Sequence, residues 1–337
     1  MSQPTPGDVH VNQNLTNVSI AHFQSAESFV ANRAGHIIPV AKQTDLIPRF
    51  KKCEMFRDTE ALRAPGAEAA VVGYELDSAL TYHAKVRAWK HPIPDQRRAN
   101  GDDWLDQDKT ATRLVTNKWL LRNERLFVAN LMTNATAAWD IKMAGVATGS
   151  YSADTNVVHF NDYTSSNANP IYEVRRVITR AQKASGGFRM KHGVMSRTVW
   201  DALALHPDFT GLISGGATAA QPSLVNRMLV AQAFELDELL VMEGVYDTAQ
   251  ENATWNPAWI AGDALLLYYK PPTPSREEPS AFYGFAWTGM AGMSREGIRM
   301  KTYREESIAS DIREIETAVD WKLTGADMGV LLYDLLA

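Results

Sequence analysis

The chain has 337 residues, of which 45% are hydrophobic, and this length corresponds to about two domains with an ordinary buried core. Its 34 Lys and Arg residues against 39 Asp and Glu residues give a net charge of −5, which lacks the basic excess of a protein that binds nucleic acid by charge alone. No apolar run approaches the ~20 residues of a transmembrane helix. The start has no signal-peptide pattern, so we expect synthesis in a cytoplasm and no membrane contact.

The N-terminal segment is expected to be an arm. The first twenty residues are rich in Gln, Asn, Thr and Pro, and they carry too few large apolar groups to form a core. Such a segment is predicted to be ordered only in an assembly. Next, Phe23, Ala26, Phe29 and Val30 recur at helical spacing and stop at Gly35, which predicts a short amphipathic helix with a glycine C-cap.

A long β-hairpin is predicted next. Residues 74–88 alternate between apolar and polar side chains, which favours one long strand. A second β-like run spans 47–57, and Pro65-Gly66 between the two runs indicates a turn. Because two strands alone are marginally stable in water, another protein surface must pack against them. We expect neighbouring subunits to cover Leu80 and Tyr82, so that Asp at both positions would abolish assembly and spare the fold.

Residues 109–144 contain a Pro-free run that predicts the longest helix, with Asp106 and Asp108 suited to its N-terminal end. The preceding aspartates do not form a calcium loop, because the required Gly and Glu positions hold Gln107 and Arg113.

The rest of the chain is predicted to alternate helices and strands before it ends in strands. The predicted helices span 171–183, 196–205 and 223–234. The predicted strands span 157–160, 190–195, 239–242, 264–269, 282–287, 298–303, 315–323 and 330–333. A Pro-rich stretch at 271–279 predicts a stiff linker.

No catalytic or ligand motif is present. The eight histidines are scattered without a metal-ligand spacing, and there is no Gly-x-Ser-x-Gly, phosphate loop or dinucleotide fingerprint. Pairs such as Asp201 with His206 occur in almost any chain of this length. We therefore expect no enzyme activity, no cofactor and no metal. A stripe of Lys118, Arg122 and Arg125 on one helical face could contact phosphate, or it could be a solvated or ion-paired edge.

The order of these parts resembles the major capsid protein of tailed double-stranded DNA bacteriophages, the Hong Kong 97 fold. The segments that carry this resemblance are Phe29-Val30-Ala31-Asn32-Arg33, Ile38-Pro39-Val40, Leu105-Asp106-Gln107-Asp108-Lys109, Leu120-Leu121-Arg122-Asn123-Glu124, Val199-Trp200-Asp201-Ala202-Leu203, His206-Pro207-Asp208, Val245-Tyr246-Asp247-Thr248-Ala249 and Val319-Asp320-Trp321-Lys322-Leu323-Thr324. The resemblance rests on their order along nearly the whole chain.

The resemblance implies an α+β fold with five parts. These are an N-terminal arm (1–46), an extended loop that is the long hairpin (47–95), a peripheral domain with a spine helix (96–145), an α/β axial domain (146–279) and return strands of the peripheral domain (280–337). The subunit-interface candidates, all on the hairpin, are Arg57, Arg63, Glu75, Asp77, Leu80, Tyr82, Lys85 and Arg87.

The function that the resemblance implies is self-assembly into hexamers and pentamers of a bacteriophage head, made in the bacterial host cytoplasm and located in the virion. Its implied partners are other copies of the chain, a portal, a separate scaffolding protein or none, a decoration protein in some relatives, and packaged DNA held by weak contact. Lys118, Arg122 and Arg125 would line the inner surface. The alternatives are an encapsulin-like nanocompartment shell and a cytosolic α/β enzyme with an unrecognised site.

Overall fold

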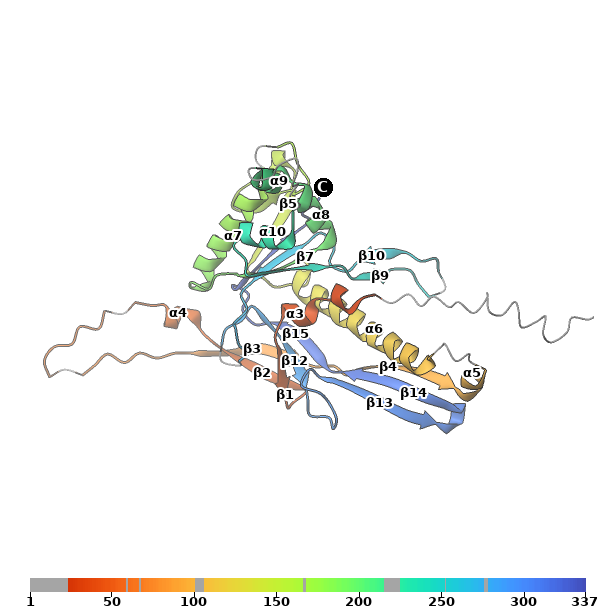
Figure 1. Cartoon of the computed structure of the whole chain (residues 1–337). Helices are drawn as coiled ribbons and strands as arrows, with labels where there is room; N and C mark the ends of the chain where they lie inside the picture. The colour runs from red at the N-terminus through yellow and green to blue at the C-terminus, as the bar shows by residue number, and fades with distance from the viewer. Residues whose placement is uncertain are drawn as a thin grey trace, which may run out of the picture.

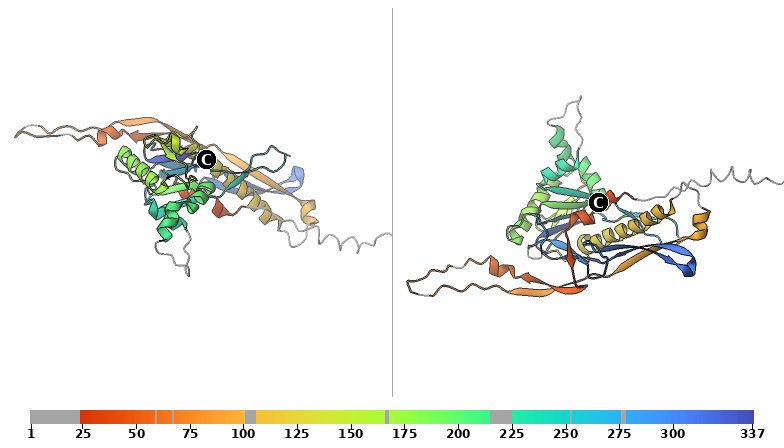
Figure 2. Two further views of the ribbon diagram at one scale, coloured as in Figure 1. Left: turned by 90° about the horizontal axis from the view of Figure 1, so that it is seen from above. Right: turned by 60° about the horizontal axis from the view of Figure 1, so that its bottom comes forward.

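The structure is a computed structural model that describes residues 24–58, 60–66, 68–100, 106–165, 168–214, 225–251, 253–275 and 278–337. An α/β body lies above an elongated body that is built on one long helix, and a hairpin extends away from both (Figures 1 and 2). The mixture of helices and strands confirms the predicted α+β class.

The upper body is a six-stranded sheet with helices packed against it. In order across the sheet, its strands are β6 (Asn156–Val158), β5 (Ile141–Val146), β16 (Gly329–Tyr333), β11 (Leu265–Tyr268), β7 (His192–Ser196) and β8 (Glu238–Met242). Its helices are α7 (Pro170–Ser185), α8 (Arg197–Leu205), α9 (Pro207–Ser214) and α10 (Arg227–Ala233), with a short turn of helix at Thr148–Ser150. Side-chain caps begin three of them, since Asn169, Ser196 and Asn226 accept backbone N–H bonds.

The lower body is built around α6 (Gln107–Phe127), which continues as a π-helical turn at Val128–Met132. One three-stranded sheet consists of β13 (Ile298–Glu305), β14 (Ser310–Thr317) and β4 (Arg87–Pro94), with α5 (Asp95–Ala99) and a turn at Glu306–Ile308 at its far end. A second sheet consists of β1 (Ile37–Val40), β12 (Phe282–Trp287) and β15 (Val319–Leu323).

The remaining elements are short. The projecting hairpin contains β2 (Thr44–Phe50), α4 (Lys52–Met55) and β3 (Leu76–His83). A smaller hairpin pairs β9 (Val245–Asp247) with β10 (Pro257–Trp259). The chain enters the described part through a turn at Ala26–Ser28 and α3 (Ala31–Ala34).

An aromatic core joins the two bodies, because the ring of Tyr268 on β11 of the upper body lies 4.9 Å from that of Phe282 on β12 of the lower body. The Phe127 ring lies edge-on to Phe282 and to Trp321, with centroids 5.4 Å apart in both pairs. Gly35 lies against this cluster, where a Cβ would come within 2.6 Å of both Phe282 and Trp321. Gly35 is the C-cap of α3, as predicted, and its N–H donates to the carbonyl of Ala31. Its backbone is extended, so close packing rather than a left-handed conformation requires glycine here.

The single strand predicted over 74–88 is also wrong. β3 ends at His83 and pairs with β2, whereas β4 begins at Arg87 and pairs with β14. Between them Ala84 is fully buried, and its N–H donates to the carbonyl of Gln43. The alternation continues through the break because both segments are half-buried strands, so the sequence pattern cannot reveal a change of partner.

The long helix ends well before the predicted residue 144. Thr133 closes the π-helical turn with a backbone N–H bond and a hydroxyl bond to the carbonyl of Val128. Thr hydroxyls compete with helical hydrogen bonds, so a helix can end without Gly or Pro. β5 and the last strand, β16, lie side by side in the sheet of the upper body, although the prediction assigns 96–145 and 280–337 to the peripheral domain.

Candidate functional site

The main candidate for an interaction surface is the projecting hairpin. β2 and β3 are antiparallel, with Thr44 opposite His83 and Phe50 opposite Leu76, and an irregularity lies between Ile47 and Arg49. Beyond this ladder the chain extends away from both bodies (Figures 1 and 2). Leu62 is 88% exposed and Val71 is 97% exposed.

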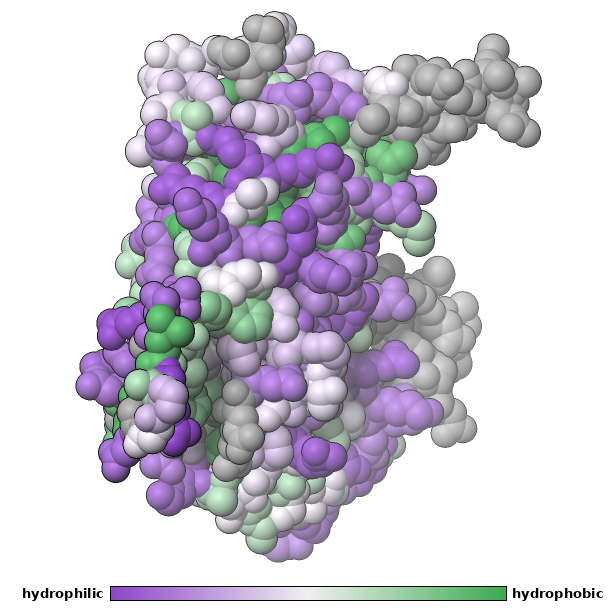
Figure 3. All heavy atoms as spheres, turned by 90° about the vertical axis from the view of Figure 1, so that its left-hand side faces the viewer, coloured by the Kyte–Doolittle hydropathy of each residue, from purple (hydrophilic) through white to green (hydrophobic). Residues whose placement is uncertain are grey.

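Many other apolar side chains of the hairpin are exposed. They are Leu46, Phe50, Met55, Phe56, Val72, Tyr74 and Leu76. Figure 3 views the molecule from the side of the hairpin and shows hydrophobic side chains among hydrophilic ones on the part that projects toward the viewer. A projecting segment that exposes this many large apolar side chains usually marks an interaction site.

Tyr82 does not belong to that exposed surface, and this corrects the prediction that a neighbouring subunit covers it. Its side chain is buried in its own subunit and stacks on Phe285 with centroids 4.8 Å apart. Its hydroxyl donates to the carbonyl of Lys42 at 3.0 Å. Leu80 is half-buried.

The base of the hairpin is fixed to the body by polar contacts. Lys52 Nζ lies 2.6 Å from a carboxylate oxygen of Asp327 and 2.6 Å from the carbonyl of Ala184 at the end of α7. Phe56 lies against Gly186, where a Cβ would come within 2.5 Å of its ring. The hairpin is thus held at one end, and at the other it extends away from the rest of the described structure.

The charged interface candidates are not brought together as one patch. Arg49 pairs with Asp77 at 3.1 Å, and Lys51 pairs with Glu75 and holds the pKa of that carboxyl below its usual range. The Arg57, Arg63 and Lys85 side chains are exposed. Arg87 lies off the hairpin on β4, where burial and the nearby Arg122 lower its pKa.

The basic stripe lies on the exposed side of α6, as its spacing predicts. Lys118, Arg122 and Arg125 are all exposed, and no acidic group among the described residues forms an ion pair with them. The Arg125 guanidinium lies 4.4 Å from the centre of the Tyr246 ring on β9. The stripe is therefore accessible, but it has only three cations, one of which rests on an aromatic ring.

A buried carboxylate, which no sequence pattern predicts, joins the N-terminal segment to α6. Glu124 is fully buried, and its two oxygens accept the N–H groups of Val30 (3.0 Å) and Ala31 (2.8 Å) at the start of α3. Beside it, Asn123 donates to Asn32 and accepts from the Trp321 indole N–H. The only sequence signal was an Asn-Glu pair within the apolar half of the helix.

Burial raises the pKa of Glu124 to about 7, although the two N–H bonds act in the opposite direction. The folded subunit thus binds a proton that the unfolded chain releases near 4.5, so stability is highest in acid and falls as pH rises from about 4.5 to 7. The expected slope is about 1.4 kcal/mol per pH unit. Glu124→Gln should remove this slope in urea unfolding of the unassembled subunit, and equal slopes in both proteins would contradict the assignment.

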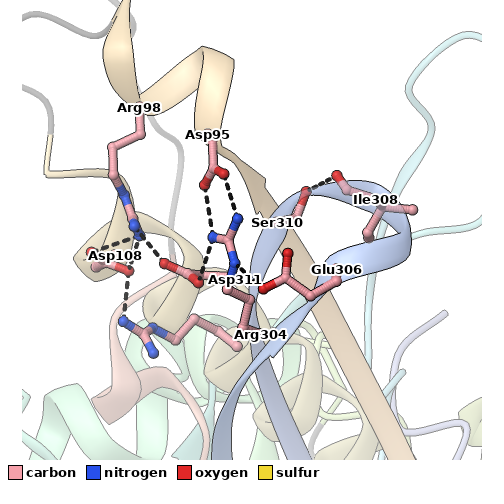
Figure 4. A network of polar contacts seen from close by, with 9 residues as sticks. Asp95, Arg98, Asp108, Arg304, Glu306, Ile308, Ser310 and Asp311 are labelled. Atoms are coloured by element: carbon pink, nitrogen blue, oxygen red, sulfur yellow. Dashed lines mark hydrogen bonds and ion pairs between the residues drawn. The ribbon is translucent and has the colours of Figure 1, made fainter.

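A network of ion pairs lies at the far end of the sheet of β13, β14 and β4 (Figure 4). Arg304 donates to both oxygens of Asp95 at 3.0 and 2.6 Å, and Arg98 pairs with Asp108 and with Asp311. The network ties α5 and the start of α6 to the β13–β14 turn. Exposed ion pairs are each worth little, so its main effect is to fix these elements in one geometry.

Within the described residues no group of His, Cys, Asp and Glu side chains could hold a metal ion. A shallow hollow on α7 is lined by residues that include Tyr172, Arg175 and Asp208. Its two arginines, Arg175 and Arg176, already bond to Glu235 and Glu173. No described helix is long and apolar enough to cross a membrane.

The fold is that of capsid proteins. Neither a family model nor a curated protein sequence matches the chain. Among solved structures, it is similar to a phage-related protein from Bordetella bronchiseptica, with a TM-score of 0.65 and 18% identity over 93% of this chain and 94% of that one. It is also similar to the capsid of cyanophage P-SCSP1u, with a TM-score of 0.58 and 10% identity over 94% and 90% of the two chains.

An encapsulin from Synechococcus elongatus shares the fold as well, with a TM-score of 0.53 and 11% identity over 100% of this chain and 96% of that one. Because these matches cover at least 93% of this chain, the predicted Hong Kong 97-like fold is confirmed.

Proposed function

We propose that the chain is the major capsid protein of a tailed bacteriophage, and that copies of it assemble as hexamers and pentamers into a shell around double-stranded DNA. The observation that carries this proposal is the exposed apolar hairpin on a fold that is similar to that of a cyanophage capsid over most of both chains. The role is structural rather than catalytic, and the subunit is made in the host cytoplasm before it enters the virion.

The hairpin would supply the main contact between subunits. Its base is fixed to its own body through Lys52, whereas Leu62 and Val71 have no cover within the described residues. Burying such side chains is worth ~1.5–3 kcal/mol each, and a second copy of the chain offers the cover at every position of a closed shell. Arg57, Arg63 and Lys85 lie exposed where they could set the register between copies.

The second candidate is the shell of an encapsulin-like nanocompartment, which is favoured by the match over the full length of this chain. Electron microscopy of purified particles combined with nuclease treatment separates the two. Large shells that protect genomic DNA support the phage capsid. Shells that hold protein and no genome support the compartment, and discrete small oligomers contradict both.

Other partners follow from the phage proposal. A portal would occupy one vertex, a scaffolding protein would be a separate chain if one is used, and a decoration protein would bind the outside if one is present. Packaged DNA would be held by weak contact, because the accessible basic stripe on α6 has only three cations.

The unassembled subunit should therefore bind duplex DNA no more tightly than ~10⁻⁴–10⁻⁶ M at physiological salt, with a shallow dependence on salt. Lys118→Glu with Arg122→Glu should change this affinity little in a fluorescence anisotropy titration. Tight binding with a steep salt slope that the double variant abolishes would instead make the stripe a dedicated DNA site.

A further inference from the structure

The sheet of β13, β14 and β4 has an open edge along β13, which is its outermost strand in Figure 1. Ala318 N–H donates to the carbonyl of Gly297, so the odd-numbered residues of β13 bond to β14 and the even-numbered ones point their backbone groups outward. Ile298 is capped there, because its N–H and its carbonyl both bond to Ser294. Three further residues have outward backbone groups with no partner among the described residues, and they are Met300, Thr302 and Arg304.

This edge lacks the features that usually prevent strand addition. At the opposite edge of the same sheet, β4 carries Pro92 and Pro94 at outward-facing positions, where a proline has no N–H to offer. β13 contains no proline. Its three cations, which could otherwise repel a further strand, are ion-paired within their own subunit: Arg299 and Lys301 with Glu316, and Arg304 with Asp95.

We propose that two copies of the chain pair antiparallel through β13, so that the sheet continues from one copy into the other. The free groups define the register: Thr302 lies opposite Thr302 of the second copy, and Met300 lies opposite Arg304 of the second copy. Every outward N–H and carbonyl of these three residues then has a partner. The exposed side chain of Met300 also gains a neighbour in the stem of Arg304.

The side chains on the other face of the strands are compatible in this register. Arg299 lies opposite Glu305 of the second copy, and Lys301 lies opposite Tyr303 of the second copy, so no like charges face each other. A shift of two residues in one direction would place Lys301 opposite Lys301 of the second copy. The same shift in the other direction would leave Met300 opposite a residue beyond the end of the strand.

A second copy is the occupant that the edge itself indicates. The same three residues supply both sides of the contact, so the contact is self-complementary and has a two-fold axis at Thr302. This inference needs only two copies of the chain and does not depend on the proposed shell. In a shell, the axis would relate subunits of adjacent capsomers, because the contacts around a hexamer or pentamer are heterologous.

Disulfide trapping tests the pairing and its register. In a Cys53→Ser background, Thr302→Cys should form a linked dimer on mild oxidation, because opposite residues of this kind lie about 5.5 Å apart between their Cα atoms. Met300→Cys is the matched control, because Met300 of the two copies would lie ~14 Å apart. On non-reducing electrophoresis the Thr302→Cys dimer should form at least about tenfold faster than the Met300→Cys dimer. Equal rates, or a faster link through Met300→Cys, would overturn the proposal.

Amide hydrogen exchange of the unassembled subunit gives a second readout that needs no cysteine. Exchange at Met300 and Arg304 should slow at least about tenfold as the protein concentration is raised, because pairing protects both amides. Thr302→Pro should remove this effect and leave the fold intact by circular dichroism, since the Thr302 N–H has no partner among the described residues of its own subunit. Thr302→Val keeps the N–H and should keep the effect.

Exchange at Met300 and Arg304 that does not depend on concentration would overturn the proposal. Fast exchange throughout would show that the edge stays open, and slow exchange throughout would show that a segment of the same chain covers it.

Discussion

Replacing Leu62 and Val71 together by Asp is expected to abolish particle formation while leaving the subunit folded. Both side chains are almost fully exposed in the single subunit, so their replacement removes no internal packing. In the shell each is expected to be buried on a neighbour, where an apolar side chain contributes ~1.5–3 kcal/mol and an unpaired carboxylate is strongly disfavoured. This loss of binding free energy recurs at every subunit contact of a closed shell.

Sedimentation velocity and circular dichroism measure the two parts of this expectation. The matched control is Leu62→Ile with Val71→Ile, which keeps an apolar surface and should still assemble. Particles formed by the Asp variant would show that the hairpin is not the main contact between subunits. A collapsed circular dichroism spectrum would show that the hairpin belongs to its own subunit's core.

The second large effect is expected at Tyr82, where the outcome should be the reverse. Tyr82→Asp removes the ring stacked on Phe285 and places a carboxylate among apolar side chains of the sheet of β1 and β12. The expected loss of folding stability is at least ~3 kcal/mol, because the packing of a buried aromatic ring is lost and a carboxylate is buried among apolar side chains. Urea unfolding of the unassembled subunit measures it.

Tyr82→Phe is the matched control for this site. It keeps the ring and removes only the hydrogen bond to the carbonyl of Lys42, so it should cost about 1 kcal/mol. A Tyr82→Asp subunit that stays as stable as the natural protein but fails to assemble would restore Tyr82 to the interface and contradict its burial.

Local patterns predicted most elements of the fold, because caps and buried runs depend on residues close in sequence. α7 and α8 begin and end within two residues of the predicted ranges 171–183 and 196–205, and β12 has the predicted bounds. The prediction was wrong or incomplete where distant residues decide the structure. The change of partner at Ala84 and the packing need at Gly35 both depend on strands more than two hundred residues away in the sequence.

The candidate site was predicted only in outline. A hairpin needing cover was visible from the Pro-Gly turn and the alternation, but alternation cannot tell which residues its own subunit covers. Tyr82 is covered by Phe285, whereas Leu62 and Val71, outside the regular alternation, are the exposed ones. Glu124 escaped prediction because its partners, the N–H groups of Val30 and Ala31, belong to a segment brought to α6 only by the tertiary fold.

The central claim is that the projecting part of the hairpin is buried on another copy of the same chain. A cryo-electron microscopy map of purified particles tests it most directly, at a resolution that traces residues 57–74. We predict that Leu62 and Val71 pack against apolar groups of a neighbouring subunit in both hexamers and pentamers. Particles in which both side chains remain in solvent, with subunits joined through other surfaces, would contradict this account.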